Sequence, residues 1–323
     1  MDFRLEFTPR SFDQKIAHQH KLFLAGSCFT EQIGSKLAAH KFRIIDNPNG
    51  ILFNPVSIAR SVVSYIDNKV YTEADLFYSN ELWGSWEHHT RFSNVSKDAA
   101  LETINHSQKA AHDFLRNADW LLLTLGSSFV YERDNRQVVA NCHKVPADKF
   151  TRRLLPPEEV ITTLDTLIHR LKNFNPGLKI IFTISPVRHL REGFVENNRS
   201  KAILIHSVHH LVDKFEGLYY FPAYELVMDD LRDYRFFAED MVHPNYAATG
   251  YVWEKFTEAC IDEPSQALMK EINMINAAKN HKPFNPTSAA HKKFLAGNLE
   301  KLEKLAAQYE YIDFSKERLF FNG

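Results

Sequence analysis

The sequence predicts an α/β fold on a mostly parallel sheet, followed by a helical C-terminal extension. Two observations predict the sheet. Short apolar runs alternate with segments of helical periodicity at least four times, and the first apolar run passes through a tight turn into a helix. The third observation concerns the last part of the chain, where strand signals stop after Trp253 and helical periodicity continues.

The first two units of the fold lie before residue 67. Apolar residues are contiguous over 21–25, Gly26-Ser27-Cys28 interrupts them, and apolar residues then recur at helical spacing over 29–37. A second extended run ends in the turn-rich segment 46–50, and a helix is expected from about Pro55. Two successive strand–turn–helix units predict a parallel sheet.

Three helix–strand pairs follow these units. They are predicted at 98–116 and 120–125, at 158–171 and 178–184, and at 201–215 and 218–221. Residues 137–145 are expected to be irregular or to form a short hairpin inserted over the sheet. We predict a core domain over residues 1–262 and a helical extension over 263–323, which covers either one edge of the sheet or the mouth of the site.

Composition narrows the function classes. The 39 Lys and Arg residues against 40 Asp and Glu give a formal net charge of −1, so nucleic acid is not expected as a partner. No apolar run approaches the about 20 residues of a membrane span, and the N-terminus lacks the apolar stretch of a secretory signal. We therefore expect a cytoplasmic protein.

Metal and disulfide chemistry are not predicted. Cys28, Cys142 and Cys260 lie far apart and form no CxxC pair, which speaks against a disulfide framework or a thiolate zinc site. The three histidines at 206, 209 and 210 share a helical face, but no carboxylate or further histidine is placed to complete a metal site. No cofactor is expected.

The turn after the first strand is the first candidate for chemistry. It lies at the carboxyl end of a parallel strand, where open α/β sheets usually build their sites. The dipole and unpaired N–H groups of a helix N-terminus stabilise a thiolate at Cys28 or an oxyanion on a substrate. The alternative is structural: Ser27 caps the helix and Cys28 is a small buried hydrophobic residue.

Asp240 and His243 are the second candidate, just before a helix that is expected from about Asn245. In a compact loop the carboxylate can orient the imidazole, so that the other ring nitrogen acts as a base. The alternative is a helix-start turn in which Asp240 caps and His243 packs. A nucleophile after the first strand and an Asp-x-x-His before the last core helix follow the order of SGNH hydrolases.

Longer motifs resemble one family within that superfamily. GSCFTEQIGSKL at residues 26–37 resembles the motif for which the GSCFA family is named. The similarity extends to NPNGILFNP at 47–55, SWEHHTRFS at 85–93, LGSSFVY at 125–131, SPVRHLREGFVENNRSKA at 185–202 and DMVHPN at 240–245. The resemblance covers nearly the whole chain. It implies the SGNH/GDSL fold, a three-layer α/β/α arrangement with about five parallel strands in flavodoxin-like order.

The resemblance also implies catalytic roles. Matching the superfamily's Gly-Asp-Ser to Gly26-Ser27-Cys28 puts Cys28 in the nucleophile position, and a shift of one residue returns that role to Ser27. His243 is implied as the base and Asp240 as the group that orients it. A thiol needs less activation than a hydroxyl, so the cysteine is compatible with acyl transfer.

The resemblance also implies an oxyanion hole, whereas the substrate-binding candidates follow from the expected positions of loops. The implied oxyanion hole consists of the N–H groups of Cys28 and Gly50 and the side chain of Ser128, which stands where the superfamily has asparagine. Loops expected near the same edge supply candidate substrate-binding residues, which are otherwise salt-bridged loop anchors: His88, His89, Arg91, Arg188 and His189. An apolar acyl pocket is expected from Tyr131, Phe194 and Tyr246.

The implied function is hydrolysis of an acyl ester, of the esterase or deacetylase type, on a small-molecule or carbohydrate substrate. Two alternatives stay open. The same site performs acyl transfer between a donor and an acceptor, or the chain is a catalytically inactive SGNH scaffold that binds a ligand. The sequence is silent on the substrate, the acyl group and the oligomeric state.

Overall fold

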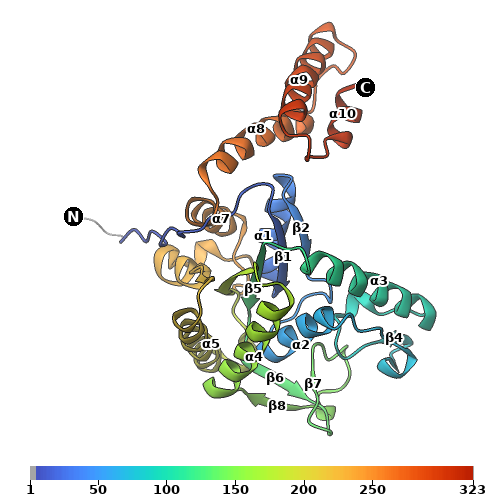
Figure 1. Cartoon of the computed structure of the whole chain (residues 1–323), viewed down its shortest axis with the longest axis vertical. Helices are drawn as coiled ribbons and strands as arrows, with labels where there is room; N and C mark the ends of the chain where they lie inside the picture. The colour runs from blue at the N-terminus through green and yellow to red at the C-terminus, as the bar shows by residue number, and fades with distance from the viewer. Residues whose placement is uncertain (1–4, 323) are drawn as a thin grey trace.

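A five-stranded parallel sheet forms the centre of the computed structural model, which describes residues 5–322 (Figure 1). Its strands are β1 (Lys21–Gly26), β2 (Arg43–Asp46), β5 (Trp120–Leu125), β9 (Lys179–Ile184) and β10 (Leu218–Tyr220). They lie in the order β10-β9-β5-β1-β2, with every neighbouring pair parallel. Numbered along the chain, this is the flavodoxin-like order 2-1-3-4-5. The predicted fold class is confirmed.

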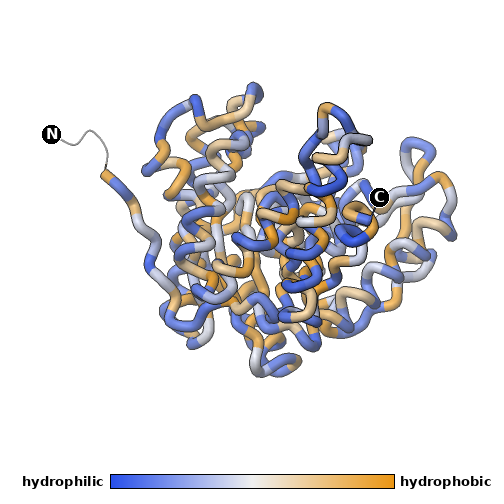
Figure 2. Tube along the Cα trace, turned by 90° about the horizontal axis from the view of Figure 1, so that it is seen from above, coloured by the Kyte–Doolittle hydropathy of each residue, from blue (hydrophilic) through white to orange (hydrophobic). Residues whose placement is uncertain are grey.

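Helices cover both faces of this sheet. One face carries α2 (Pro55–Ile66), α3 (Lys97–Leu115), α4 (Pro157–Phe174) and α5 (Phe194–Lys214); the other carries α1 (Cys28–Ala39), α6 (Ala223–Glu225), the π-helical segment Leu226–Leu231 and α7 (Tyr246–Cys260). Successive strand residues point to opposite faces. Leu121 therefore belongs to the first hydrophobic core and Leu122 to the second. In Figure 2 the hydrophobic segments gather toward the centre and hydrophilic turns surround them.

Two small antiparallel sheets are inserted between the elements of the central sheet. The first is a hairpin of β3 (Phe77–Ser79) and β4 (Leu82–Gly84); the second has the order β7-β6-β8, with β6 (Phe129–Glu132), β7 (Val138–Val139) and β8 (Thr151–Leu154). The sequence predicts only a hairpin or irregular segment at 137–145 in this region. β8 escapes prediction because its four residues are exposed or half-buried, so they show no apolar pattern.

The C-terminal helices are α8 (Glu263–Asn280), α9 (Ala289–Gln308) and α10 (Ser315–Asn322), which have a hydrophobic cluster of their own and project from α7 (Figure 1). They contact the rest of the chain near the end of α1 and the start of β2. Lys41 Nζ lies 2.7 Å from Glu317 Oε2, and His18 Nδ1 lies 3.1 Å from the Tyr311 hydroxyl. The extension therefore packs beside the amino end of an edge strand rather than over the carboxyl ends.

Candidate active site

The turn between β1 and α1 puts Cys28 at a helix N-terminus. Gly26 has a φ of +144°, and a Cβ at this position would lie 2.2 Å from the carbonyl oxygen of Thr124 in β5, so only glycine fits. Ser27 is fully buried and is the N-cap of α1, where its hydroxyl accepts the N–H of Phe29 at 3.3 Å. The Ser27 hydroxyl thus serves the helix, whereas the Cys28 side chain is half-buried.

Three adjacent strands bring distant segments together at the carboxyl edge. Gly26, the last residue of β1, pairs with Thr124, and the Ser27 N–H donates to the Thr124 carbonyl at 3.1 Å, so Cys28 begins α1 beside the end of β5. Gly126 and Ser185 follow directly after the paired ends of β5 and β9. The Ser185 N–H donates to the Leu125 carbonyl at 2.8 Å, so the pairing continues past the ends of the strands. This edge is where parallel sheets usually carry their ligands.

Lys201, from α5, is buried at the same edge. Its Nζ donates to the carbonyl oxygens of Gly126 and Ser185, each at 2.6 Å. Burial lowers the pKa of Lys201 to about 7, while a negative charge on Cys28 acts in the opposite direction. Burial raises the pKa of the Cys28 thiol. The N–H groups at the start of α1 act to lower it, the charge of Glu31 acts to raise it, and the charge of Lys201 makes the smallest contribution, which lowers it.

Lys201 is not among the predicted site residues, although its position in the sequence carries a signal. It occupies the buried face of α5 with Leu204, Val208 and Leu211, at positions i, i+3, i+7 and i+10. A lysine on such an apolar face is rarely buried without a function or a partner.

Asp240 and His243 form a hydrogen-bonded pair in a tight loop before α7. The Asp240 Oδ2 lies 2.6 Å from His243 Nδ1, while Oδ1 accepts the N–H groups of Val242 at 2.9 Å and His243 at 3.0 Å. The backbone N–H of His243, followed by its ring, lowers the pKa of Asp240 to about 2. The carboxylate holds the imidazole through Nδ1, which leaves Nε2 to accept a proton.

Arg188 holds this loop from the segment after β9. Its guanidinium lies 3.9 Å from the ring centroid of Phe237 and 4.9 Å from that of Tyr234. The guanidinium donates to the Met241 carbonyl, and the Arg188 N–H donates to the Val242 carbonyl, both at 3.2 Å. Arg188 was predicted to bind substrate; in this arrangement its contacts are those of a loop anchor.

His189 follows Arg188 and lies beside Gly126. Its Nε2 is 3.0 Å from the position that a Cβ on Gly126 would take, and its ring meets Phe53 edge-on at 5.1 Å. Among the described residues this buried nitrogen has no hydrogen-bond partner. Burial, with the charges of Lys201 and His243, lowers the pKa of His189 to about 3. His189 is therefore neutral and interacts electrostatically with both halves of the site.

The two predicted oxyanion donors besides Cys28 are already engaged. The Gly50 N–H donates to the Asn47 carbonyl at 2.7 Å. The Ser128 side chain is fully buried. Its hydroxyl donates toward Ser200, whose Oγ lies 3.0 Å and whose carbonyl oxygen lies 3.2 Å from Ser128 Oγ. Within residues 5–322, the Cys28 N–H has no main-chain acceptor, and no hydrogen bond joins Cys28 to His243.

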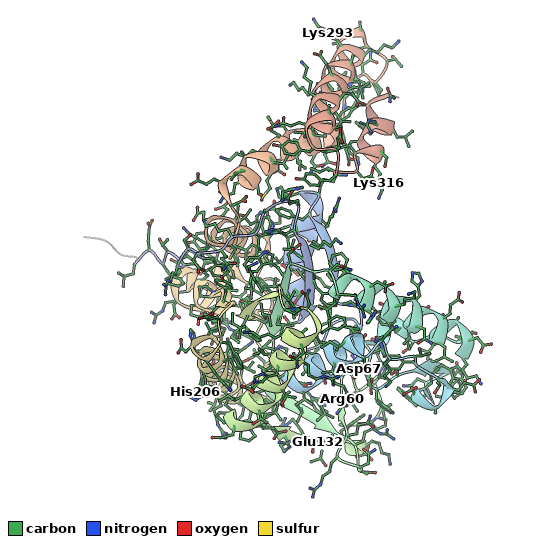
Figure 3. The ribbon with its side chains drawn as sticks, viewed as in Figure 1. Arg60, Asp67, Glu132, His206, Lys293 and Lys316 are labelled. Carbon is green, nitrogen blue, oxygen red and sulfur yellow. The ribbon has the colours of Figure 1, made fainter. Side chains whose placement is uncertain are left out.

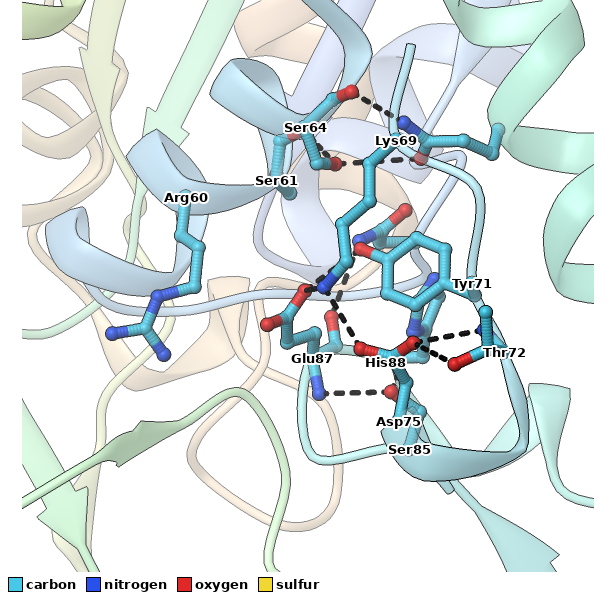
Figure 4. A network of polar contacts seen from close by, with 12 residues as sticks. Arg60, Ser61, Ser64, Lys69, Tyr71, Thr72, Asp75, Ser85, Glu87 and His88 are labelled. Carbon is cyan, nitrogen blue, oxygen red and sulfur yellow. Dashed lines mark hydrogen bonds and ion pairs between the residues drawn. The ribbon is translucent and has the colours of Figure 1, made fainter. Parts of the chain in front are cut away.

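His88 lies inside the protein rather than at an open surface. It is 1% exposed, its Nδ1 is 3.0 Å from the Ser85 hydroxyl, and its ring stands edge-on to Tyr71 at 4.8 Å. Figure 4 shows the polar network around it, in which Glu87 accepts from the Tyr71 hydroxyl at 2.7 Å and from Lys69 at 3.1 Å. Burial lowers the pKa of His88 to about 3, so the ring is neutral.

His89 and Arg91 support the segment that follows β2. A Cβ on Gly50 would lie 2.2 Å from the Cβ of His89, so the two residues are packed tightly together. Arg91 donates to the Glu31 carboxylate at 2.7 Å and also to the Asn47 carbonyl. These contacts are again those of loop anchors.

The other candidate groups do not gather at this edge. His206, His209 and His210 are exposed on α5, and Figure 3 shows His206 at the periphery. Phe194 and Tyr246 are 57% and 88% exposed. A cavity of about 780 Å³ lies beside β10; His209 lines it, but none of the predicted catalytic, oxyanion-hole or substrate-binding residues does.

Two features are absent from the described part of the chain. No group of three or more metal-binding side chains occurs there. None of its helices combines the length and the apolar composition that a membrane span requires.

Comparisons with known proteins give a family and a distant structural likeness. The comparison with curated proteins finds no match. A carbohydrate esterase family 3 structure from Talaromyces cellulolyticus is similar at 10% identity and a TM-score of 0.36, covering 79% of this chain and 99% of that one. An acetyl xylan esterase from Butyrivibrio proteoclasticus is similar at 12% identity and a TM-score of 0.38, covering 79% of this chain and 65% of that one.

Likenesses at these scores carry no argument about chemistry. The family comparison is more extensive. A model described as the GSCFA family matches residues 21–256, and one described as the C-terminal domain of GSCFA domain proteins matches residues 272–322. This chain therefore belongs to the GSCFA family.

Proposed function

We propose that this protein is an SGNH-type acyl-ester hydrolase in which Cys28 is the nucleophile, His243 the base and Asp240 the group that orients the base. The observation that carries the proposal is the 2.6 Å pair between Asp240 and His243, whose side chains are 48% and 44% exposed. Their loop is bonded to the segment after β9, and β9 ends at the same sheet edge at which Cys28 begins α1.

The proposed reaction has two steps. His243 Nε2 takes the proton of the Cys28 thiol, and the thiolate attacks the ester carbonyl while the Cys28 N–H at the helix N-terminus stabilises the oxyanion. The leaving alcohol takes the proton from His243. Water then gives a proton to the same imidazole and attacks the thioester carbonyl; the C–S bond breaks, the carboxylic acid leaves, and the imidazolium returns the proton to the Cys28 sulfur. Gly50 and Ser128 contribute only if they release Asn47 and Ser200.

Ser27 is the less suitable nucleophile. Its hydroxyl is fully buried and already accepts the Phe29 N–H, so attack by Ser27 would require the helix cap to open. The half-exposed pair of Asp240 and His243 fits an acyl group on a polar molecule such as a carbohydrate, since a large acceptor can remain in solvent.

Two observations favour a second candidate function. Both additional oxyanion donors are engaged elsewhere, and no hydrogen bond joins Cys28 to His243 within residues 5–322. A protein that has lost turnover but retains the scaffold, and so binds the ester without cleaving it, would have these features. Catalytic hydrogen bonds are often long without substrate, so the hydrolase stays the better-supported candidate.

Turnover of p-nitrophenyl acetate and of acetylated sugars tests the proposal. We expect Cys28→Ala and His243→Ala to lower kcat/KM by about a thousandfold or more. Ser27→Ala is expected to cost about 1 kcal/mol of stability through the lost cap and to retain most turnover. Cys142→Ser, at a half-buried cysteine outside the site, is the matched control.

Retention of turnover by Cys28→Ala would refute the assignment of the nucleophile. If wild-type protein cleaves no ester but binds an acetylated sugar in calorimetry, and Cys28→Ala binds it equally well, the second candidate replaces the hydrolase.

A further inference from the structure

We propose that Lys201 is a positioning residue that supplies the buried positive charge under Cys28 and so stabilises its thiolate. The inference rests on the proposed function only in taking Cys28 as the nucleophile. Formation of the thiolate needs no ester, so it can be tested by itself.

The first argument is the position of Lys201. Its Nζ bridges the carbonyl oxygens of Gly126 and Ser185, which follow directly after β5 and β9 at the sheet edge where Cys28 begins α1. The amine is therefore held at this edge by two hydrogen bonds of 2.6 Å. An ammonium has three N–H groups, and these two carbonyls use two of them.

The second argument is the lack of a permanent counter-charge. Lys201 is 1% exposed, and no carboxylate within residues 5–322 pairs with it. An ammonium buried without an anion is costly, by several kcal/mol, so such a group is expected to face a site where negative charge develops. Cys28 is the group whose negative charge favours the protonated lysine.

The other groups that face Lys201 do not supply that charge. His189, from the segment after β9, is neutral because of its burial and because it feels the charges of Lys201 and His243. Tyr224, from α6, presents its ring face with the centroid 5.8 Å from Nζ, and its pKa is raised by burial, so it also stays neutral.

The proton balance follows from this arrangement. The Cys28 S–H bond breaks and the proton passes to His243 Nε2, which leaves a thiolate and an imidazolium. The pKa of Lys201 is about 7, and the negative charge on Cys28 raises it, so the thiolate increases the fraction of protein in which the lysine is protonated. No hydrogen bond joins Nζ to the sulfur among the described residues, so the effect of the lysine on Cys28 is electrostatic. By linkage, the thiolate must favour the charged lysine as much as the lysine favours the thiolate.

The test is the rate at which iodoacetamide alkylates Cys28, located by peptide mass spectrometry, between pH 6 and 9. Only the thiolate reacts. We expect Lys201→Met to slow alkylation at pH 7 about tenfold, as a rise of one unit in the apparent pKa of Cys28 requires. Lys172→Met is the matched control, because Lys172 also donates to a main-chain carbonyl, that of Glu216, outside the site.

A second measurement covers the case in which Lys201→Met does not fold. Cys28→Ala removes only a half-buried thiol, and Lys201 can be followed by NMR with lysine labelled at Cε, assigned with Lys201→Arg. We expect the lysine to titrate at lower pH in Cys28→Ala than in wild type. Equal alkylation rates in folded Lys201→Met, or identical lysine titrations, would overturn the inference.

The experiments distinguish a failure of the lysine inference from a failure of the proposed hydrolase function. Alkylation that depends on Lys201 without any ester turnover leaves the lysine inference standing and removes the hydrolase. Ester turnover that depends on Cys28, with alkylation unchanged in Lys201→Met, leaves the hydrolase standing and removes the lysine inference.

Discussion

Replacing Arg188 by alanine tests whether this arginine positions the catalytic loop or binds substrate. The side chain stacks on Phe237 at 3.9 Å and donates to the Met241 carbonyl at 3.2 Å. Arg188→Ala removes both of these contacts and the longer 4.9 Å contact with the Tyr234 ring, and it keeps the main-chain bond from Arg188 to Val242. The loop that carries Asp240 and His243 is therefore loosened rather than detached.

The size of the effect follows from these two contacts. A cation–π contact at a partly exposed site contributes about 0.5–1 kcal/mol. A hydrogen bond from a charged donor contributes about 1.5 kcal/mol at the lower end of its range. Together they amount to about 2 kcal/mol, which corresponds to a roughly thirtyfold increase in the population of the open loop.

Hydrogen exchange measures this opening directly. The Ala238 N–H donates to the His243 carbonyl at 2.7 Å and reports closure of the loop. We expect its exchange to be about thirtyfold faster in Arg188→Ala, with kcat for ester turnover reduced and KM nearly unchanged. Arg199→Ala removes an exposed arginine paired with Glu196 and is the control. A raised KM with unchanged exchange would refute the anchoring role and restore substrate binding.

Three further predictions concern other parts of the chain. The pKa of Asp240 is lowered to about 2. The contribution of the Asp240 carboxylate to the order of the loop is therefore fully present above about pH 4 and is lost as the pH falls through 2. The chemical shift of the His243 amide should follow this transition. Glu317→Gln removes the charge that pairs with Lys41 at 2.7 Å and Lys279 at 3.2 Å, so proteolysis of the linker at 281–287 should become faster, and an unchanged rate would argue against docking through this carboxylate. Gly26→Ala forces a Cβ into the neighbouring strand at a φ of +144° and should destabilise the fold by about 3 kcal/mol or more in urea unfolding.

The central sheet could be predicted because its strands leave a strong local signal. The strand predicted at 120–125 has the observed bounds of β5, since all six residues are buried and all but Thr124 are apolar. The small inserted sheet leaves no such signal. β8 contains Arg152 and Arg153. Arg152 pairs with Glu192 and Arg153 pairs with Glu132, and these partners lie on other elements of the fold.

The candidate site likewise has one part that could be predicted from the sequence and one part that only the fold reveals. The pair of Asp240 and His243 is local, three residues apart, and its geometry follows from one loop. The roles of Ser128 and Lys201 depend on partners 72 and 75 residues away, which no spacing reveals. The sequence could propose Ser128 as a donor because of its place in a motif, whereas only the fold directs its hydroxyl toward Ser200.

The thiol and the buried lysine are best understood together. A serine hydroxyl ionises at so high a pH that a nearby cation leaves it protonated, and it depends on a base during attack. A thiol ionises near pH 8.5, so a fixed positive charge can change its thiolate fraction at neutral pH. A lysine held under Cys28 by two carbonyls therefore suits a cysteine in this position, where a serine at the same place would gain little from it.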